Sequence, residues 1–237
     1  MITTIIFDLD GTLLPMDQEE FLTHYFHKLT QKFSMVPPKQ VISSVQLGVK
    51  AMFLNDGAKT NDQAFWESFI TAFPVHDHTK EQFEHFYAHE FQELQQLTPK
   101  DPLVKEIIKC LKEKDYRLIC CTNPVFPKIA THSRIQWTGL QPDDFSFITT
   151  YENSHFCKPN LKYYQEVLDC LHLSATECMM IGNDVDEDMC TKQMGMKTYL
   201  VSNHIINRYN RSLDVDEVGS REDLLSFVKR LPHCSKE

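Results

Sequence analysis

Hydrophobic residues follow two different spacings in the first hundred residues of this chain. Residues 3–10 form an apolar run that ends in polar side chains, which predicts a buried β-strand. From Pro15 onward the apolar side chains recur at helical spacing, and turn residues interrupt them at Pro37-Pro38, Asp56-Gly57 and Pro74. We therefore expect helices over residues 17–34, 38–54, 61–72 and 79–96, packed as a small bundle.

The chain changes character again at Thr98-Pro99, where strand and helix patterns begin to alternate. The predicted strands cover residues 116–122, 145–149, 178–182 and 198–201, and the predicted helices lie at 102–114, 162–171, after Asp184 and at 221–230. Alternation of this kind is typical of a parallel sheet with helices on its faces. We predict an α/β fold, with a Rossmann-like parallel-sheet core from residues 1–15 and 98–237. Residues 16–97 are predicted to form an inserted α-helical bundle, the cap domain.

The first strand ends in Asp8-Leu9-Asp10-Gly11-Thr12, which places two carboxylates one residue apart. Burying an ionised carboxylate costs free energy unless a cation pairs with it or its pKa rises so that it is neutral. Two neighbouring carboxylates increase that cost. Mg²⁺ is a suitable partner because it binds few protein oxygens and keeps coordination sites for water and phosphate. A surface turn with solvated acids is the alternative interpretation of this segment alone.

Polar residues also follow the other predicted strands. Thr122-Asn123 follows the second strand, Lys158-Pro159 precedes a helix, and Gly182-Asn183-Asp184 ends a later strand with Asp188 four residues on. Because ligands collect at the carboxyl ends of strands in open α/β sheets, we expect these residues to meet Asp8 and Asp10 on one rim. Taken separately, Thr122-Asn123 is compatible with a helix cap and Lys158 with a surface cation.

The charge and composition of the chain argue against several classes of protein. The formal charge of −9 over 237 residues disfavours general binding of nucleic-acid polymers. No apolar stretch approaches the ~20 residues of a membrane span, and the N-terminus has no signal-peptide pattern, so we expect a cytoplasmic protein without a membrane partner. The eight cysteines show no metal-knuckle spacing and are expected to be reduced. His85 and His89 would share a helical face, but a polar exposed helix explains them better than a metal site.

In this order, the motifs resemble those of the haloacid dehalogenase superfamily. The resemblance covers nearly the whole chain and is closest to the metal-dependent phosphatases that carry a helical cap after the first strand. It implies that Asp8 is the nucleophile, which forms an aspartyl-phosphate, and that Asp10 is the general acid and base. It also implies one Mg²⁺, bound by Asp8, Asp10 and Asp184, with Asp10 contributing its backbone carbonyl.

The same resemblance assigns the phosphate and supporting contacts. Thr122, Asn123 and Lys158 are implied to bind the phosphoryl group, and replacing Lys158 by alanine is expected to lower turnover more than stability. Asp188 is implied to hold a metal-bound water or to orient Lys158. Asp186 and Glu187 are predicted to point away, as solvated residues of a helix N-terminus.

Other functions stay open at this point. A phosphomutase would use the same aspartyl-phosphate, and a phosphonatase would need a reactive lysine in the cap. A dehalogenase is disfavoured because it needs neither Asp10 nor the acidic segment at Asp184. Outside the enzymes, a receiver-like switch or a silent phosphate-binding module is compatible with some of the residues. We expect the substrate to be a small phosphorylated metabolite; its identity and the oligomeric state do not follow from the sequence.

Overall fold

A computed structural model describes residues 1–74 and 78–234. In this part of the chain, six parallel strands form one sheet in the order β3-β2-β1-β4-β5-β6. Their bounds are β1 Thr4–Phe7, β2 Arg117–Cys120, β3 Phe147–Ile148, β4 Cys178–Gly182, β5 Lys197–Val201 and β6 Glu217–Gly219. The predicted parallel α/β sheet is confirmed, and β6 is a strand that the sequence pattern did not indicate.

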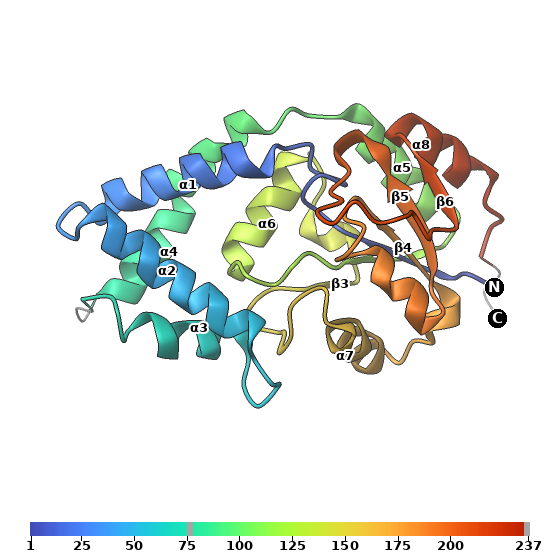
Figure 1. The fold of residues 1–237 in the computed structure, drawn as a ribbon. Coiled ribbons are helices and arrows are strands. Elements are labelled where there is room, and N and C mark those ends of the chain that lie inside the picture. The colour runs from blue at the N-terminus through green and yellow to red at the C-terminus, as the bar shows by residue number, and fades with distance from the viewer. Residues whose placement is uncertain (75–77, 235–237) are drawn as a thin grey trace.

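Alternating side chains of the strands supply two hydrophobic cores, one on each face of the sheet. Phe7 packs in the cluster that contains helices α5 (Pro102–Glu113) and α8 (Arg221–Arg230), whereas Ile6 packs in the cluster of α7 (Leu161–Leu171). Figure 1 shows α5 and α8 on one side of the sheet and α7 on the other. Because both faces are covered, the strands are apolar almost throughout.

The segment between β1 and α5 is helical and lies beside the sheet, at the left of Figure 1. It contains α1 Gln18–Lys32, α2 Pro38–Phe53, α3 Asn61–Phe69, α4 Thr79–Ala88 and the 3₁₀ helix η1 Glu90–Leu97. Asp17 caps α1 by accepting a hydrogen bond from the Glu20 amide at 2.9 Å, and Pro38 occupies the first position of α2. Closely packed aromatic rings, Phe69 among them, fill its interior.

The structure departs from the expected helices in three places. The helix predicted over 79–96 ends at Ala88, because His89 has non-helical torsion angles (φ −125°, ψ −78°) and η1 follows. The helix predicted after Asp184 is a turn followed by the 3₁₀ helix η4, Met189–Met194. Helix α6, Lys128–Trp137, was not predicted, because its buried side chains include Thr131 and Arg134 and so hide its apolar spacing. Shorter 3₁₀ helices are η2 Pro142–Asp144, η3 Ala175–Glu177 and η5 Ser202–His204.

Asn61, at the start of α3, joins the helical insert to the sheet domain. Its side chain is fully buried, and its Nδ2 donates to the carbonyl oxygens of Pro124 (3.4 Å) and Phe156 (3.2 Å). Its backbone amide donates to the Ser154 carbonyl at 2.8 Å. Pro124 follows Thr122-Asn123 and Phe156 precedes Lys158, so this single residue contacts two of the loops that carry predicted site residues.

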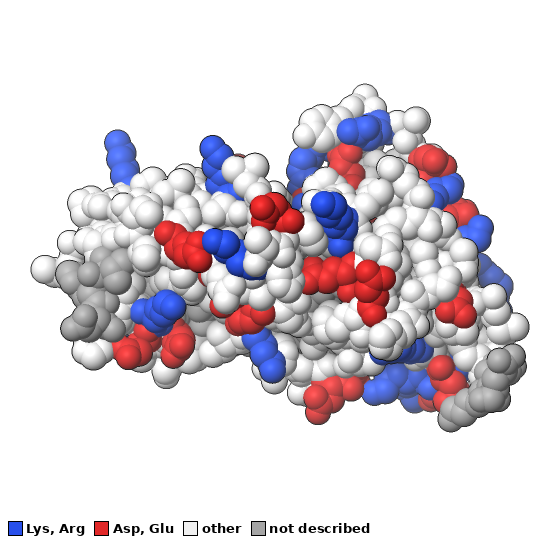
Figure 2. Space-filling view, turned by 90° about the horizontal axis from the view of Figure 1, so that it is seen from below, with Lys and Arg blue, Asp and Glu red and all other residues white. Residues whose placement is uncertain are grey.

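Acidic and basic side chains are interspersed on the face drawn in Figure 2. Within residues 1–74 and 78–234, none of the helices has the length and apolar character needed to cross a membrane.

Candidate active site

The predicted site residues come from the carboxyl ends of neighbouring strands. Asp8 directly follows β1, Thr122 lies two residues after β2, and Asn183-Asp184 directly follows β4. Since β1 pairs with both β2 and β4 in parallel, these three segments leave the sheet at the same edge. Lys158 reaches this edge from the loop before α7, and its ammonium contacts Asp8.

Lys158 lies at the centre of the site. Its side chain is 1% exposed, and its Nζ donates to Asp8 Oδ1 at 2.8 Å and to Asp188 Oδ1 at 2.6 Å. Burial by itself lowers the pKa of Lys158, but the Asp188 and Asp8 carboxylates outweigh it and raise the pKa well above the ordinary value. Lys158 is therefore a permanent cation held between the expected nucleophile and a second carboxylate.

Asp10 makes a different ion pair, with a residue that the sequence analysis did not single out. The Nη1 of Arg134, on helix α6, donates to Asp10 Oδ2. The Arg134 side chain is 1% exposed, and its guanidinium carbon lies 4.6 Å from the centre of the Phe126 ring. Burial raises the pKa of Asp10, Arg134 opposes this, and the Asp8 charge adds to the increase. The other oxygen, Oδ1, is buried without a hydrogen-bond partner among the described residues.

The acidic loop after β4 is held by its own backbone amides. Asp184 Oδ1 accepts from the amides of Asp186 and Glu187, both at 2.9 Å, and Asp188 Oδ2 accepts from the amides of Asn183 (3.1 Å) and Asp184 (3.0 Å). These hydrogen bonds fix the two carboxylates without help from a helix.

Asp184 also pairs with a cation from a distant loop. The Nη1 of Arg208 lies 2.5 Å from Asp184 Oδ2, and the Arg208 side chain is 45% exposed. Arg208 was missed because it lies in a polar segment with no strand or helix pattern around it.

The loop after Asp10 needs a glycine. Gly11 has φ +85°, and a Cβ at this position would lie 2.3 Å from the Asn183 side-chain nitrogen. Next to it, Thr12 Oγ1 donates to Asn183 Oδ1 at 3.0 Å. Arg221, at the start of α8, donates to the carbonyl oxygens of Thr12 (2.7 Å) and Gly11 (2.8 Å). The C-terminal helix thus supports the loop that carries both aspartates.

Hydrogen bonds hold both the backbone of Thr122 and the side chain of Asn123. The backbone oxygen of the buried Thr122 accepts from the hydroxyls of Thr149 and Tyr163, both at 2.8 Å, so two side chains hold this loop. Asn123 Nδ2 donates to Glu187 Oε2 at 3.0 Å. The phosphate-binding role of Thr122 and Asn123 stays a prediction.

The expectation that Asp186 and Glu187 are solvated helix residues is wrong. Residues 184–188 form a turn, and the Glu187 carboxylate folds back toward Asn123. Burial raises the pKa of Glu187, with Lys158 opposing. Asp186 instead forms an ion pair with Arg211 at 2.6 Å. The prediction failed because a helical pattern was extended into a turn that is closed by carboxylate-to-amide hydrogen bonds.

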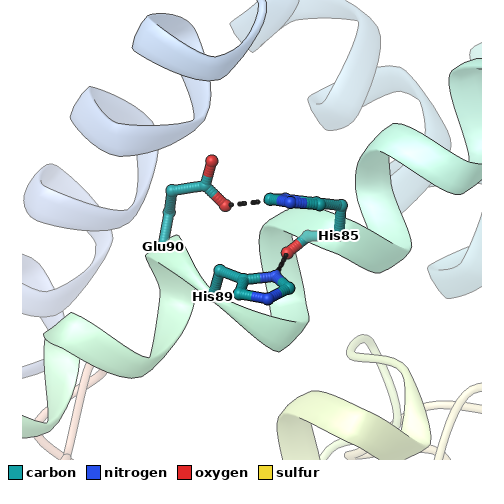
Figure 3. A group of neighbouring side chains, drawn as sticks. All are labelled: His85, His89 and Glu90. Atoms are coloured by element: carbon teal, nitrogen blue, oxygen red, sulfur yellow. Dashed lines mark hydrogen bonds and ion pairs between the residues drawn. The ribbon is translucent and has the colours of Figure 1, made fainter.

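His85 and His89 do lie together, with stacked rings whose centres are 4.0 Å apart, and Glu90 completes a group of possible ligands (Figure 3). Lys32, however, places its ammonium 2.7 Å from both His85 Nδ1 and Glu90 Oε1. A cation already neutralises the carboxylate, so an ion-pair cluster on the surface of the helical insert explains these residues.

Comparison with known proteins agrees with this geometry. A model of the haloacid dehalogenase-like hydrolase family matches residues 5–201, which is most of the chain. The chain belongs to this family. Pyrophosphatase PpaX of Bacillus cereus (strain G9842) is 24% identical over 236 residues, which cover 97% of this chain and 99% of that protein.

Solved structures of haloacid dehalogenase-like proteins share the fold. A HAD phosphatase from Thermococcus onnurineus superposes with a TM-score of 0.61 at 17% identity, covering 98% of this chain and all of that one. The HAD hydrolase YfnB from Bacillus subtilis, solved with magnesium bound, has a TM-score of 0.58 at 16% identity. The match covers 96% of this chain and 98% of that one. Several 2-haloacid dehalogenases also match the fold, so the fold alone does not select the reaction. The family makes this chain a hydrolase.

Proposed function

We propose that this hydrolase is a phosphatase that hydrolyses a small organic phosphomonoester with Mg²⁺ as cofactor, through an aspartyl-phosphate on Asp8. The observation that carries the proposal is the separation of the two expected catalytic carboxylates into different ion pairs. Lys158 holds Asp8, and Arg134 holds Asp10. Two neighbouring acids in different environments are able to take different roles, one as nucleophile and one as proton carrier.

The residues at the rim fit a hard divalent cation. The proposed ligands are the carboxylates of Asp8 and Asp184 and the backbone carbonyl of Asp10, which are the oxygen donors that Mg²⁺ prefers. Acidic groups also outnumber basic ones here: five acids (Asp8, Asp10, Asp184, Glu187, Asp188) face three bases (Lys158, Arg134, Arg208), so an excess of acids remains when Asp10 carries the proton of the proposed mechanism. A bound Mg²⁺ would offset this excess and withdraw charge from the phosphoryl oxygens.

In the first half of the proposed reaction, a carboxylate oxygen of Asp8 attacks phosphorus, and the bond from phosphorus to the leaving oxygen breaks. Asp10 gives its proton to that oxygen, and the alcohol departs. Lys158 and the Thr122 hydroxyl hold the phosphoryl oxygens. Burial and the nearby Asp8 charge raise the pKa of Asp10, which favours the protonated form that this step needs, while Arg134 opposes the increase.

In the second half, Asp10 accepts a proton from water as the water oxygen attacks phosphorus. The bond between phosphorus and Asp8 breaks, which releases phosphate and restores both carboxyl groups to their starting state. The insert of residues 16–97 is proposed to act as the cap that covers the site and excludes bulk water.

The test is a phosphate-release assay on the full chain with a panel of phosphomonoesters, with and without EDTA. We expect activity that EDTA abolishes and Mg²⁺ restores, and that Asp8→Asn loses by at least a thousandfold. Asp17→Asn is the matched control, because Asp17 caps α1 outside the site and asparagine caps equally well. Acid-quenched turnover should show a phosphoryl adduct on Asp8 by mass spectrometry. Activity that survives in Asp8→Asn, in folded protein, would rule out the proposed nucleophile.

A further inference from the structure

An apolar cavity of about 540 Å³ lies where the helical insert meets the sheet domain. Helices α1 to α4 form most of its wall, and Val125, Phe126 and Tyr151 close it from the side of the sheet domain. Two large apolar side chains that line it, Leu22 and Phe53, are 44% and 47% exposed. A volume of this size is within the range of pockets that hold organic ligands.

The cavity adjoins the catalytic residues through a short chain of contacts. Val125 and Phe126 follow Thr122-Asn123 after one residue, Pro124, and the Val125 amide donates to the Asn123 carbonyl at 2.8 Å. The ring of Phe126 faces the cavity and also carries the guanidinium of Arg134, which binds Asp10. Because Asp10 is proposed to protonate the leaving oxygen, the leaving group departs on the side of Asp10, Arg134 and Phe126.

The lining chemistry restricts what this cavity accepts. Its surface is formed mainly by aromatic and aliphatic side chains, and Lys50 is the one charged residue among the described residues that line it. The hydroxyls of Tyr25 and Tyr87 bond to each other at 2.9 Å, so they are already partnered. A second phosphate or a carboxylate on the substrate would lose its hydration here with a single cation to replace it.

We propose that the cavity binds the leaving group and that this group is an apolar organic alcohol, with aromatic rings or a branched or extended hydrocarbon part. The inference rests on the proposed phosphatase mechanism and names the substrate class of the same site. It excludes pyrophosphate, the compound in the name of the Bacillus cereus relative, as a good substrate of this chain.

The experiment measures kcat/KM for a homologous series of n-alkyl phosphates from methyl to octyl, together with phenyl phosphate, pyrophosphate and 2-phosphoglycolate. Each methylene that enters the cavity is expected to raise kcat/KM by about fourfold, from ~0.8 kcal/mol per buried CH₂ and ~1.36 kcal/mol per tenfold. Pyrophosphate and 2-phosphoglycolate carry a second anionic group and are expected to have the lowest kcat/KM.

Val49→Trp supplies the structural test, because Val49 lines the cavity from α2, a helix that carries none of the proposed catalytic residues. It should flatten the dependence on chain length and leave methyl phosphate hydrolysis unchanged. Leu47→Trp is the matched control, since Leu47 lies on the same helix outside the cavity and should keep the wild-type slope.

A binding measurement covers the case in which Val49→Trp fails to fold. Trp66 lines the cavity and Trp137 does not, so octyl phosphate should change the tryptophan fluorescence of Asp8→Asn, and Trp66→Phe should remove that change. A flat chain-length series, or a preference for pyrophosphate or 2-phosphoglycolate, would overturn the inference while Asp8-dependent phosphate release still supported the proposed function. If no substrate gave Asp8-dependent release, both would fall.

Discussion

Arg134→Met tests the ion pair that places Asp10. Arg134 is 1% exposed and Asp10 is 18% exposed at the side chain, so the substitution leaves a largely buried carboxylate without its cation. Breaking a buried ion pair by removing one partner costs about 3–5 kcal/mol. Because Asp10 retains some contact with solvent and is able to take up a proton, we expect the lower end, about 3 kcal/mol. In a chain of 237 residues this corresponds to a fall in Tm of roughly 6–12 °C.

The assay is thermal unfolding followed by circular dichroism, extended to a double-mutant cycle with Asp10→Asn. Removing both charges leaves no unpaired ion, so the double variant should lose about 1–3 kcal/mol less than the sum of the single losses. Arg117→Met is the matched control: Arg117 donates to Ser146 Oγ and to the Leu171 carbonyl but pairs with no carboxylate of the described residues, and should lose only about 1 kcal/mol.

Two results would refute this reasoning. One is a Tm of Arg134→Met within about 2 °C of the wild type, a shift too small for a broken buried ion pair. The other is additivity of the two substitutions within ~0.5 kcal/mol, which would show that Arg134 and Asp10 do not stabilise each other.

Three further substitutions test other contacts. Lys158→Met leaves two buried carboxylates unpaired, so it should lower the free energy of unfolding by about 3–5 kcal/mol and also abolish phosphate release. A urea unfolding curve that matches the wild type would contradict this. Arg208→Met removes the exposed cation that competes for Asp184, and it should lower the Mg²⁺ concentration for half-maximal activity by about 1.5–5-fold; a higher requirement would assign Arg208 to metal support instead. Asn61→Ala breaks the buried link from the helical insert to the sheet and should cost about 1–3 kcal/mol; an unchanged free energy of unfolding would show that this link is not needed for stability.

The expectation for Lys158 shows how burial changes a prediction made from sequence. As one cation in a motif, Lys158 was expected to matter more for turnover than for stability. The structure places it at 1% exposure between Asp8 and Asp188, where its charge compensates two acids in a region largely shielded from solvent. Its loss is therefore expected to affect folding too.

Helix α6 shows why apolar spacing in a sequence does not reveal every helix. A sequence pattern identifies a helix by apolar side chains that repeat on one face, because those are the side chains that leave water. In α6 the buried face includes Thr131, Ser133 and Arg134, which read as solvent-facing residues. Arg134, the ion-pair partner of Asp10, was hidden for the same physical reason, since a buried guanidinium is stable only when the carboxylate that pairs with it is already in place.

The sequence by itself determined the parallel α/β sheet and the positions of Asp8, Asp10, Thr122, Lys158 and Asp184. Buried parallel strands are continuous apolar runs, and residues that end such runs share one edge by the geometry of the sheet. Only the tertiary structure decided which cations meet those acids and what fills the space beside them. Arg134, Arg208 and Arg221 come from three separate segments, and the apolar cavity lies between two domains. Contacts of this kind depend on distances between remote parts of the chain, which no local pattern records.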